Sequence, residues 1–168
     1  MKTKNLTDEQ MKLYFVEHIR YEMQQLINAT DAINRQLAIC NGLQYMIVES
    51  FAIHLRNLIT FLYPYSKREN DVCAEDFFVD ANKWQSLCPA ISVILKNAKS
   101  RADKEVGHLT TLRQFGTPES KKWSVSDLID EVMPILKIFC EAADKVELIN
   151  CFKPIWDQYV YTKRLRPV

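Results

Sequence analysis

The sequence predicts an all-α fold, most simply an antiparallel bundle of four to five helices. Apolar residues recur at three- and four-residue spacing in several long stretches, which is the period of an amphipathic helix. Strand-like alternation is absent, and the chain of 168 residues has only three glycines, so tight hairpins have few places to form. At this length we expect a single all-α domain over residues 1–168.

The first helix is predicted over residues 8–29. Thr7, followed three residues later by Gln10, has the spacing of a capping box at the helix start. Six apolar residues then follow at helical spacing, namely Leu13, Val16, Ile19, Met23, Leu26 and Ile27. Since Thr30 and Asp31 are favourable N-caps, we expect the first helix to end there and a second helix to begin.

That second helix is predicted over residues 31–63, because Pro64 disfavours the helical conformation in the residue before it. The segment 64–89 contains a polar turn and lacks a long helical pattern. We expect it to be a long connection with one short helix at about 74–86. Connections of this length in compact domains are often functional.

Two further helices are predicted over residues 90–109 and 124–146. Pro134 lies inside the second of these and predicts a kink. The core helices therefore span about 8–146, and residues 147–168 are expected to form an aromatic and basic C-terminal tail.

Composition excludes several classes of function. Lys plus Arg number 22 and Asp plus Glu 21, so the formal charge of +1 creates no global field that would attract nucleic acid or an anionic membrane. The five cysteines include no C-x-x-C pair, which predicts free thiols. Neither an apolar signal core nor a run of about 20 apolar residues is present. We expect a cytoplasmic protein with no membrane association.

The histidines do not indicate a metal site. Glu105 and His108 form one Glu-x-x-His unit, whereas a carboxylate-bridged metal bundle needs two. Glu22 lies four residues after His18, a reachable but isolated pair. No Gly-x-Ser-x-Gly motif is present either. No metal, no cofactor and no classical hydrolase chemistry is expected.

A polar stripe near residue 100 is the strongest catalytic candidate. On an ideal helix Asn97, Arg101, Lys104 and His108 fall within about 60° of one another. An arginine fork suits a phosphate, and a histidine can transfer protons near neutral pH. These are the two functions that metal-free phosphodiester cleavage requires. The alternative is a solvated polar face.

A second candidate is His54-Leu55-Arg56-Asn57, which interrupts an otherwise apolar helix. Arg56 shares a helix face with Glu49, so the spacing allows an ion pair between these two side chains. One interpretation is therefore a pair that fixes helix packing. The other is that His54, Arg56 and Asn57 contact a substrate or an interface.

The stretch from Arg101 to His108, an arginine and a histidine separated by six residues, resembles the motif of the HEPN superfamily. The segments His54–Pro64 and Lys104–Thr110 are similar to those of uncharacterised bacterial members related to abortive-infection proteins. Active members usually have a polar residue directly after the arginine, where this chain has Ala102. In Arg56-Asn57 a polar residue does follow the arginine, but Tyr63 occupies the position where the motif has its histidine.

The resemblance implies a homodimer in which two arginine–histidine helices face each other, with Arg101 holding the scissile phosphate and His108 acting as acid or base. In such a protein, linked to phage defence or toxin–antitoxin systems, the activity would be that of a metal-independent endoribonuclease. Other members are non-catalytic dimeric modules that bind RNA, a nucleotide or a protein. We also expect Phe77, Phe78, Trp84 and the aromatic tail to be exposed, leaving apolar area for a partner chain to cover.

Overall fold

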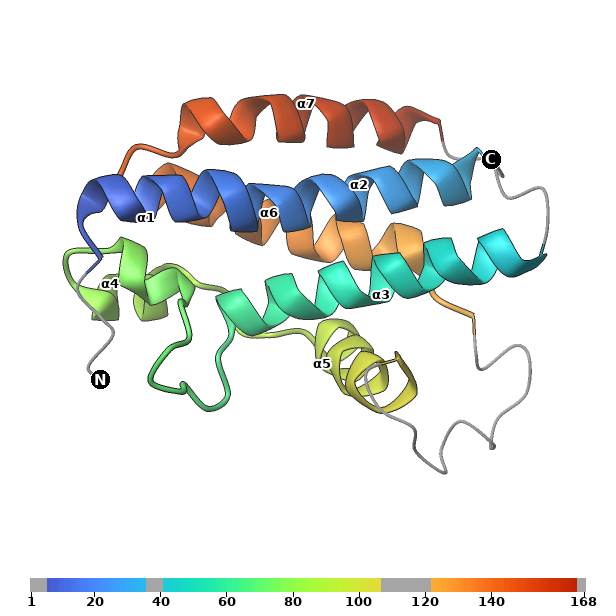
Figure 1. Cartoon of the computed structure of the whole chain (residues 1–168), viewed down its shortest axis with the longest axis horizontal. Coiled ribbons are helices and arrows are strands. Elements are labelled where there is room, and N and C mark those ends of the chain that lie inside the picture. Colours follow the sequence, from blue (N-terminus) through green and yellow to red (C-terminus); the bar gives the residue numbers. More distant parts are fainter. Residues whose placement is uncertain (1–5, 36–40, 107–121, 166–168) are drawn as a thin grey trace.

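The computed structural model describes residues 6–35, 41–106 and 122–165 (Figure 1). Over these ranges the regular structure is helical and no strand occurs, which confirms the predicted all-α class. None of the described helices is both long and apolar enough to cross a bilayer.

The N-terminal helical segment is one continuous rod of three parts. It comprises α1 (Asp8–Tyr14), the π-helical turn η1 (Phe15–Ile19) and α2 (Arg20–Asn34). The predicted capping box is confirmed, because Gln10 N donates to Thr7 Oγ1 at 3.2 Å and Thr7 N donates to Gln10 Oε1 at 2.9 Å.

The predicted helix break at Thr30 is wrong. Thr30 is fully buried inside α2, and its hydroxyl donates to the carbonyl of Leu26 at 2.8 Å. A threonine hydroxyl can be satisfied by the carbonyl four residues earlier, so burial against other helices keeps the residue helical despite its preference for caps. Helix α3 (Asn41–Leu62) then runs back antiparallel to α2 and ends just before Pro64, as predicted (Figure 1).

The connection after α3 contains the 3-10 turn η2 (Ala74–Phe77) and α4 (Ala81–Leu87). The predicted exposure of its aromatic residues is wrong. Phe77, Phe78 and Trp84 are 0%, 1% and 3% exposed, and their rings lie 5.4, 6.1 and 5.6 Å from the ring of Phe139. The connection folds onto the core because six large aromatic rings can pack together there. The homodimer prediction loses this part of its basis.

The remaining helices are α5 (Val93–Arg101), the π-helical turn η3 (Ala102–Val106), α6 (Val125–Ala142) and α7 (Ile149–Arg164). The expected C-terminal tail is instead a core helix, since Phe152, Ile155 and Tyr159 on α7 are buried. Helix α7 packs along α2 and α6 (Figure 1). The apolar residues of this segment recur at the 3.6-residue period of a helix and so form one apolar face that packs on the core. The aromatic and basic residues between them make this period hard to recognise in the sequence.

Candidate functional site

A polar cleft of about 510 Å³ opens beside the C-terminal half of α3. Its walls come from the N-terminal helical rod, α3, the loop of residues 64–73 and α5. Most of its charged and polar lining is contributed by side chains far apart in the sequence, among them His18, Glu22, Arg56, Asn57, Arg68 and Lys99. A concave site with convergent polar groups is where a ligand is expected to bind.

The N-terminal rod contributes a row of titratable side chains. Tyr14, His18 and Glu22, spaced four residues apart, all line the cleft. The rings of Tyr14 and His18 lie 4.7 Å apart. Burial raises the pKa of Tyr14, and the nearby Cys73, Asp71 and Glu22 raise it further. The π-helical turn of residues 15–19 carries His18, and such turns occur frequently at functional sites.

Glu22 is held in place by α3. His54 Nδ1 lies 2.7 Å from Glu22 Oε2, and Asn57 Nδ2 donates to the same oxygen at 3.2 Å. Because a carboxylate only accepts hydrogen bonds, Nδ1 of His54 carries the proton in this contact. The ring of Tyr21 packs edge-on against His54 with centroids 5.7 Å apart. The His54–Asn57 motif therefore fixes a carboxylate at the wall of the cleft.

Arg56 and Lys99 share one carboxylate. Arg56 Nε donates to Asp103 Oδ1, and Lys99 Nζ lies 3.1 Å from Asp103 Oδ2. Burial acts to raise the pKa of Asp103, but the hydrogen bonds and charges of Arg56 and Lys99 outweigh it and lower the pKa. The three side chains together carry a net charge of about +1.

The predicted ion pair between Glu49 and Arg56 is not formed. Glu49 is exposed, and Arg56 turns to Asp103 on η3. Spacing along α3 alone could not reveal this partner, because Asp103 lies 47 residues further along the chain.

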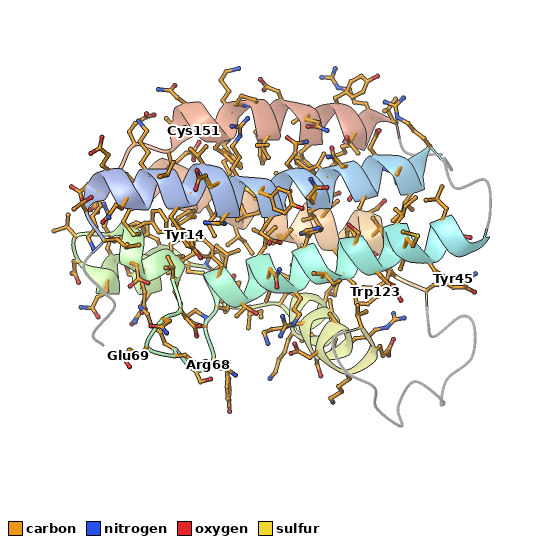
Figure 2. The ribbon with its side chains drawn as sticks, viewed as in Figure 1. Tyr14, Tyr45, Arg68, Glu69, Trp123 and Cys151 are labelled. Atoms are coloured by element: carbon orange, nitrogen blue, oxygen red, sulfur yellow. The ribbon has the colours of Figure 1, made fainter. Side chains whose placement is uncertain are left out.

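The loop that closes one side of the cleft is anchored by its own side chains. Lys67 Nζ donates to Glu75 Oε1 at 2.6 Å and to Asp76 Oδ1 at 2.7 Å. The backbone amide of Arg68 donates to Asp71 Oδ2 at 2.8 Å. Arg68 lies at the outer end of the loop and Tyr14 on the side of the rod that faces it (Figure 2). Across the described ranges the guanidinium of Arg68 makes no ion pair.

Arg101 lies outside the cleft and has several partners. Its Nε donates to Glu105 Oε2 at 2.7 Å, its Nη1 donates to the carbonyl of Lys122 at 2.8 Å, and its guanidinium lies 4.4 Å above the ring of Trp123. These contacts tie the C-terminal end of α5 to η3 and to the segment just before α6. A phosphate would have to compete with them for the guanidinium.

His108 falls outside the described residues, so the pairing of Arg101 with His108 stays a prediction. Asn97 and Lys104 are exposed on α5 and η3 and do not line the cleft. The π-helical turn over residues 102–106 widens the helix, so the 100° per residue assumed for the stripe does not hold through it.

Sequence reasoning found two members of the cleft, Arg56 and Asn57, and considered His18 with Glu22 only as a metal-binding pair. Arg68 and Lys99 were missed, because each is an ordinary surface cation in its own segment. The part of the chain that is described contains no group of three or more His, Cys, Asp or Glu side chains able to hold a metal ion. No family profile, curated protein sequence or solved structure matches the chain.

Proposed function

We propose that the protein binds the phosphate backbone of RNA in this cleft and cleaves it without a metal ion. The observation that carries the proposal is that His18 lines the same 510 Å³ cleft as Arg56, Arg68 and Lys99. Guanidinium and ammonium groups bind phosphate oxygens, and a histidine transfers protons at neutral pH. A nearly neutral chain can still bind a strand locally, because phosphate contacts depend on the cations at the site.

The chemistry needs a base and an acid. His18 removes the proton of a ribose 2′-hydroxyl, the 2′-oxygen bonds to phosphorus, and the bond from phosphorus to the 5′-oxygen breaks. Tyr14, kept protonated by its raised pKa and in ring contact with His18, gives its proton to that leaving oxygen. Arg56 and Lys99 stabilise the charge that builds on the phosphate oxygens.

The test compares two histidine variants in a chelating buffer with a fluorescent single-stranded RNA. If the cleft is the active site, His18→Ala lowers the cleavage rate by about 10²–10⁴-fold, whereas His108→Ala leaves it unchanged. The reverse result assigns catalysis to Arg101 and His108 and overturns the cleft assignment. A uniformly deoxy strand of the same sequence is the control for cleavage through the 2′-hydroxyl.

A second candidate is a non-catalytic binding module with the same ligand site. It is favoured by the pairing of Arg56 and Lys99 with Asp103, which offsets part of their charge before any ligand arrives. Intact RNA after prolonged incubation with wild-type protein, together with salt-dependent binding, would support this function over cleavage. A homodimer stays a prediction in either case, and sedimentation velocity measures it.

A further inference from the structure

We propose that Glu22 accepts a hydrogen bond from a ribose hydroxyl, so that the cleft selects a ribonucleotide strand over a deoxyribonucleotide strand. The inference rests on the proposed binding of a nucleic-acid strand in the cleft. It adds the group that distinguishes the two kinds of strand.

The hydrogen bonds of Glu22 are unequally divided between its two oxygens. Oε2 takes both, from His54 Nδ1 at 2.7 Å and from Asn57 Nδ2 at 3.2 Å. Within the described ranges Oε1 accepts none. The side chain is 21% exposed and lines the cleft, so a ligand can reach this oxygen.

A carboxylate in this position selects the kind of group that can approach it. It only accepts hydrogen bonds and repels a phosphate, so its partner must be a donor such as a hydroxyl or an amino group. The cations that attract phosphate, Arg56 and Lys99, line the same cleft. A ligand that satisfies both carries phosphates and hydrogen-bond donors close together, which describes a nucleotide strand.

The division of bonds on Glu22 favours a hydroxyl over a base edge. The Watson–Crick edge of guanine presents two parallel donors, which match a carboxylate only when both oxygens are open. Because the protein already donates twice to Oε2, only Oε1 is open, and a single hydroxyl donor fits it. The 2′-hydroxyl is the donor by which proteins tell RNA from DNA.

The support from α3 makes the acceptor rigid. His54 and Asn57 lie three residues apart on one helix and both donate hydrogen bonds to Oε2 of Glu22. The carboxylate is therefore already held in place before a strand binds. A preorganised group loses less entropy on binding than a mobile side chain does.

The experiment measures binding of three eight-nucleotide strands of one sequence, RNA, DNA and 2′-O-methyl RNA, by fluorescence anisotropy at 4 °C, with each value read immediately after mixing, before the RNA is cleaved. We expect wild-type protein to bind RNA about tenfold or more tighter than either other strand, since a hydrogen bond to a charged acceptor is lost in both. The 2′-O-methyl strand keeps the RNA backbone but cannot donate. It tests the contact in wild-type protein, whether or not a variant folds.

In Glu22→Gln the preference for RNA over the 2′-O-methyl strand should disappear, because the 2′-oxygen of either strand can accept from an amide N–H. The amide oxygen is expected to face the two donors of α3, which turns the amide nitrogen, a donor, toward the cleft. Glu141→Gln, which removes the same charge from an exposed position on α6, should keep the full preference. Equal wild-type binding of all three strands, or an unchanged preference in folded Glu22→Gln, overturns this inference alone. Failure of every strand to bind overturns the proposed function and this inference with it.

Discussion

Replacing Asp103 with asparagine should strengthen RNA binding, because it releases two cations of the cleft. Arg56 and Lys99 both pair with this carboxylate, and the three groups carry a net charge of about +1. Asp103→Asn raises that charge to about +2 while keeping the size and shape of the side chain. A backbone phosphate then has one more uncompensated positive charge to contact.

The size of the effect follows from counterion release. One further phosphate contact to a single strand steepens the fall of log K with log salt by about 0.7. Between 1 M and 0.1 M salt this amounts to about fivefold in affinity. Asp103→Asn should therefore bind a short RNA about fivefold tighter than wild type at 0.1 M salt, and nearly equally at 1 M.

The assay is an anisotropy titration at four salt concentrations between 0.1 and 1 M. Asp157→Asn is the matched control, because it also breaks a Lys–Asp pair four residues apart, with Lys153 at 2.9 Å, but lies on α7 away from the cleft. The control should change affinity by less than about twofold, since distant exposed charges are screened. Equal slopes for wild type and Asp103→Asn, or an equal gain in Asp157→Asn, would refute the reasoning.

Three further predictions concern stability. Phe139→Leu removes the ring at the centre of the aromatic core and should lower the free energy of unfolding by about 2–3 kcal/mol in urea titrations. A loss below about 1 kcal/mol would show that this ring is not central to the core. Burial raises the pKa of Tyr63, so wild-type stability should fall as pH rises above about 10, and thermal melts of Tyr63→Phe should show a smaller fall. At neutral pH the same variant loses the hydrogen bond to the carbonyl of Pro89, worth about 1 kcal/mol. If wild type and Tyr63→Phe lose equal stability above about pH 10, ionisation of Tyr63 is not the cause of the fall. Ile155→Ala should cost about 2–5 kcal/mol in chemical denaturation, because α7 is part of the core, whereas a loss typical of an exposed tail would show that α7 does not stabilise the fold.

Local patterns in the sequence were enough to predict the helical class and those helix ends that depend on nearby backbone chemistry. Thr7 starts the first helix and Pro64 follows the last turn of α3, and both act through groups within four residues of themselves. The apolar periods that predicted the other helices are local in the same sense. These features need no knowledge of which helix packs on which.

Which apolar segments are buried follows instead from how the helices pack on one another. Thr30 continues its helix and Phe77 lies in the core, although each was expected to behave otherwise. The residues 149–164 form a buried helix where a tail was expected. Burial depends on what covers a segment. Helix α7 is covered by α2, which ends more than a hundred residues before it, and by α6, which ends seven residues before it.

The cleft likewise follows from packing between distant segments. His54 and Asn57 were recognisable as unusual in an apolar helix, but their partner Glu22 precedes them by more than 30 residues. Asp103 pairs with Arg56 although the two lie 47 residues apart in the chain. Asp103 lies in a π-helical turn, so the regular rotation of an α-helix, about 100° per residue, does not predict which way its side chain points. Periodicity predicts which side chains share one helix, whereas the charges that meet in a cleft are set by how separate helices pack, and that packing is fixed by the summed burial of their apolar faces.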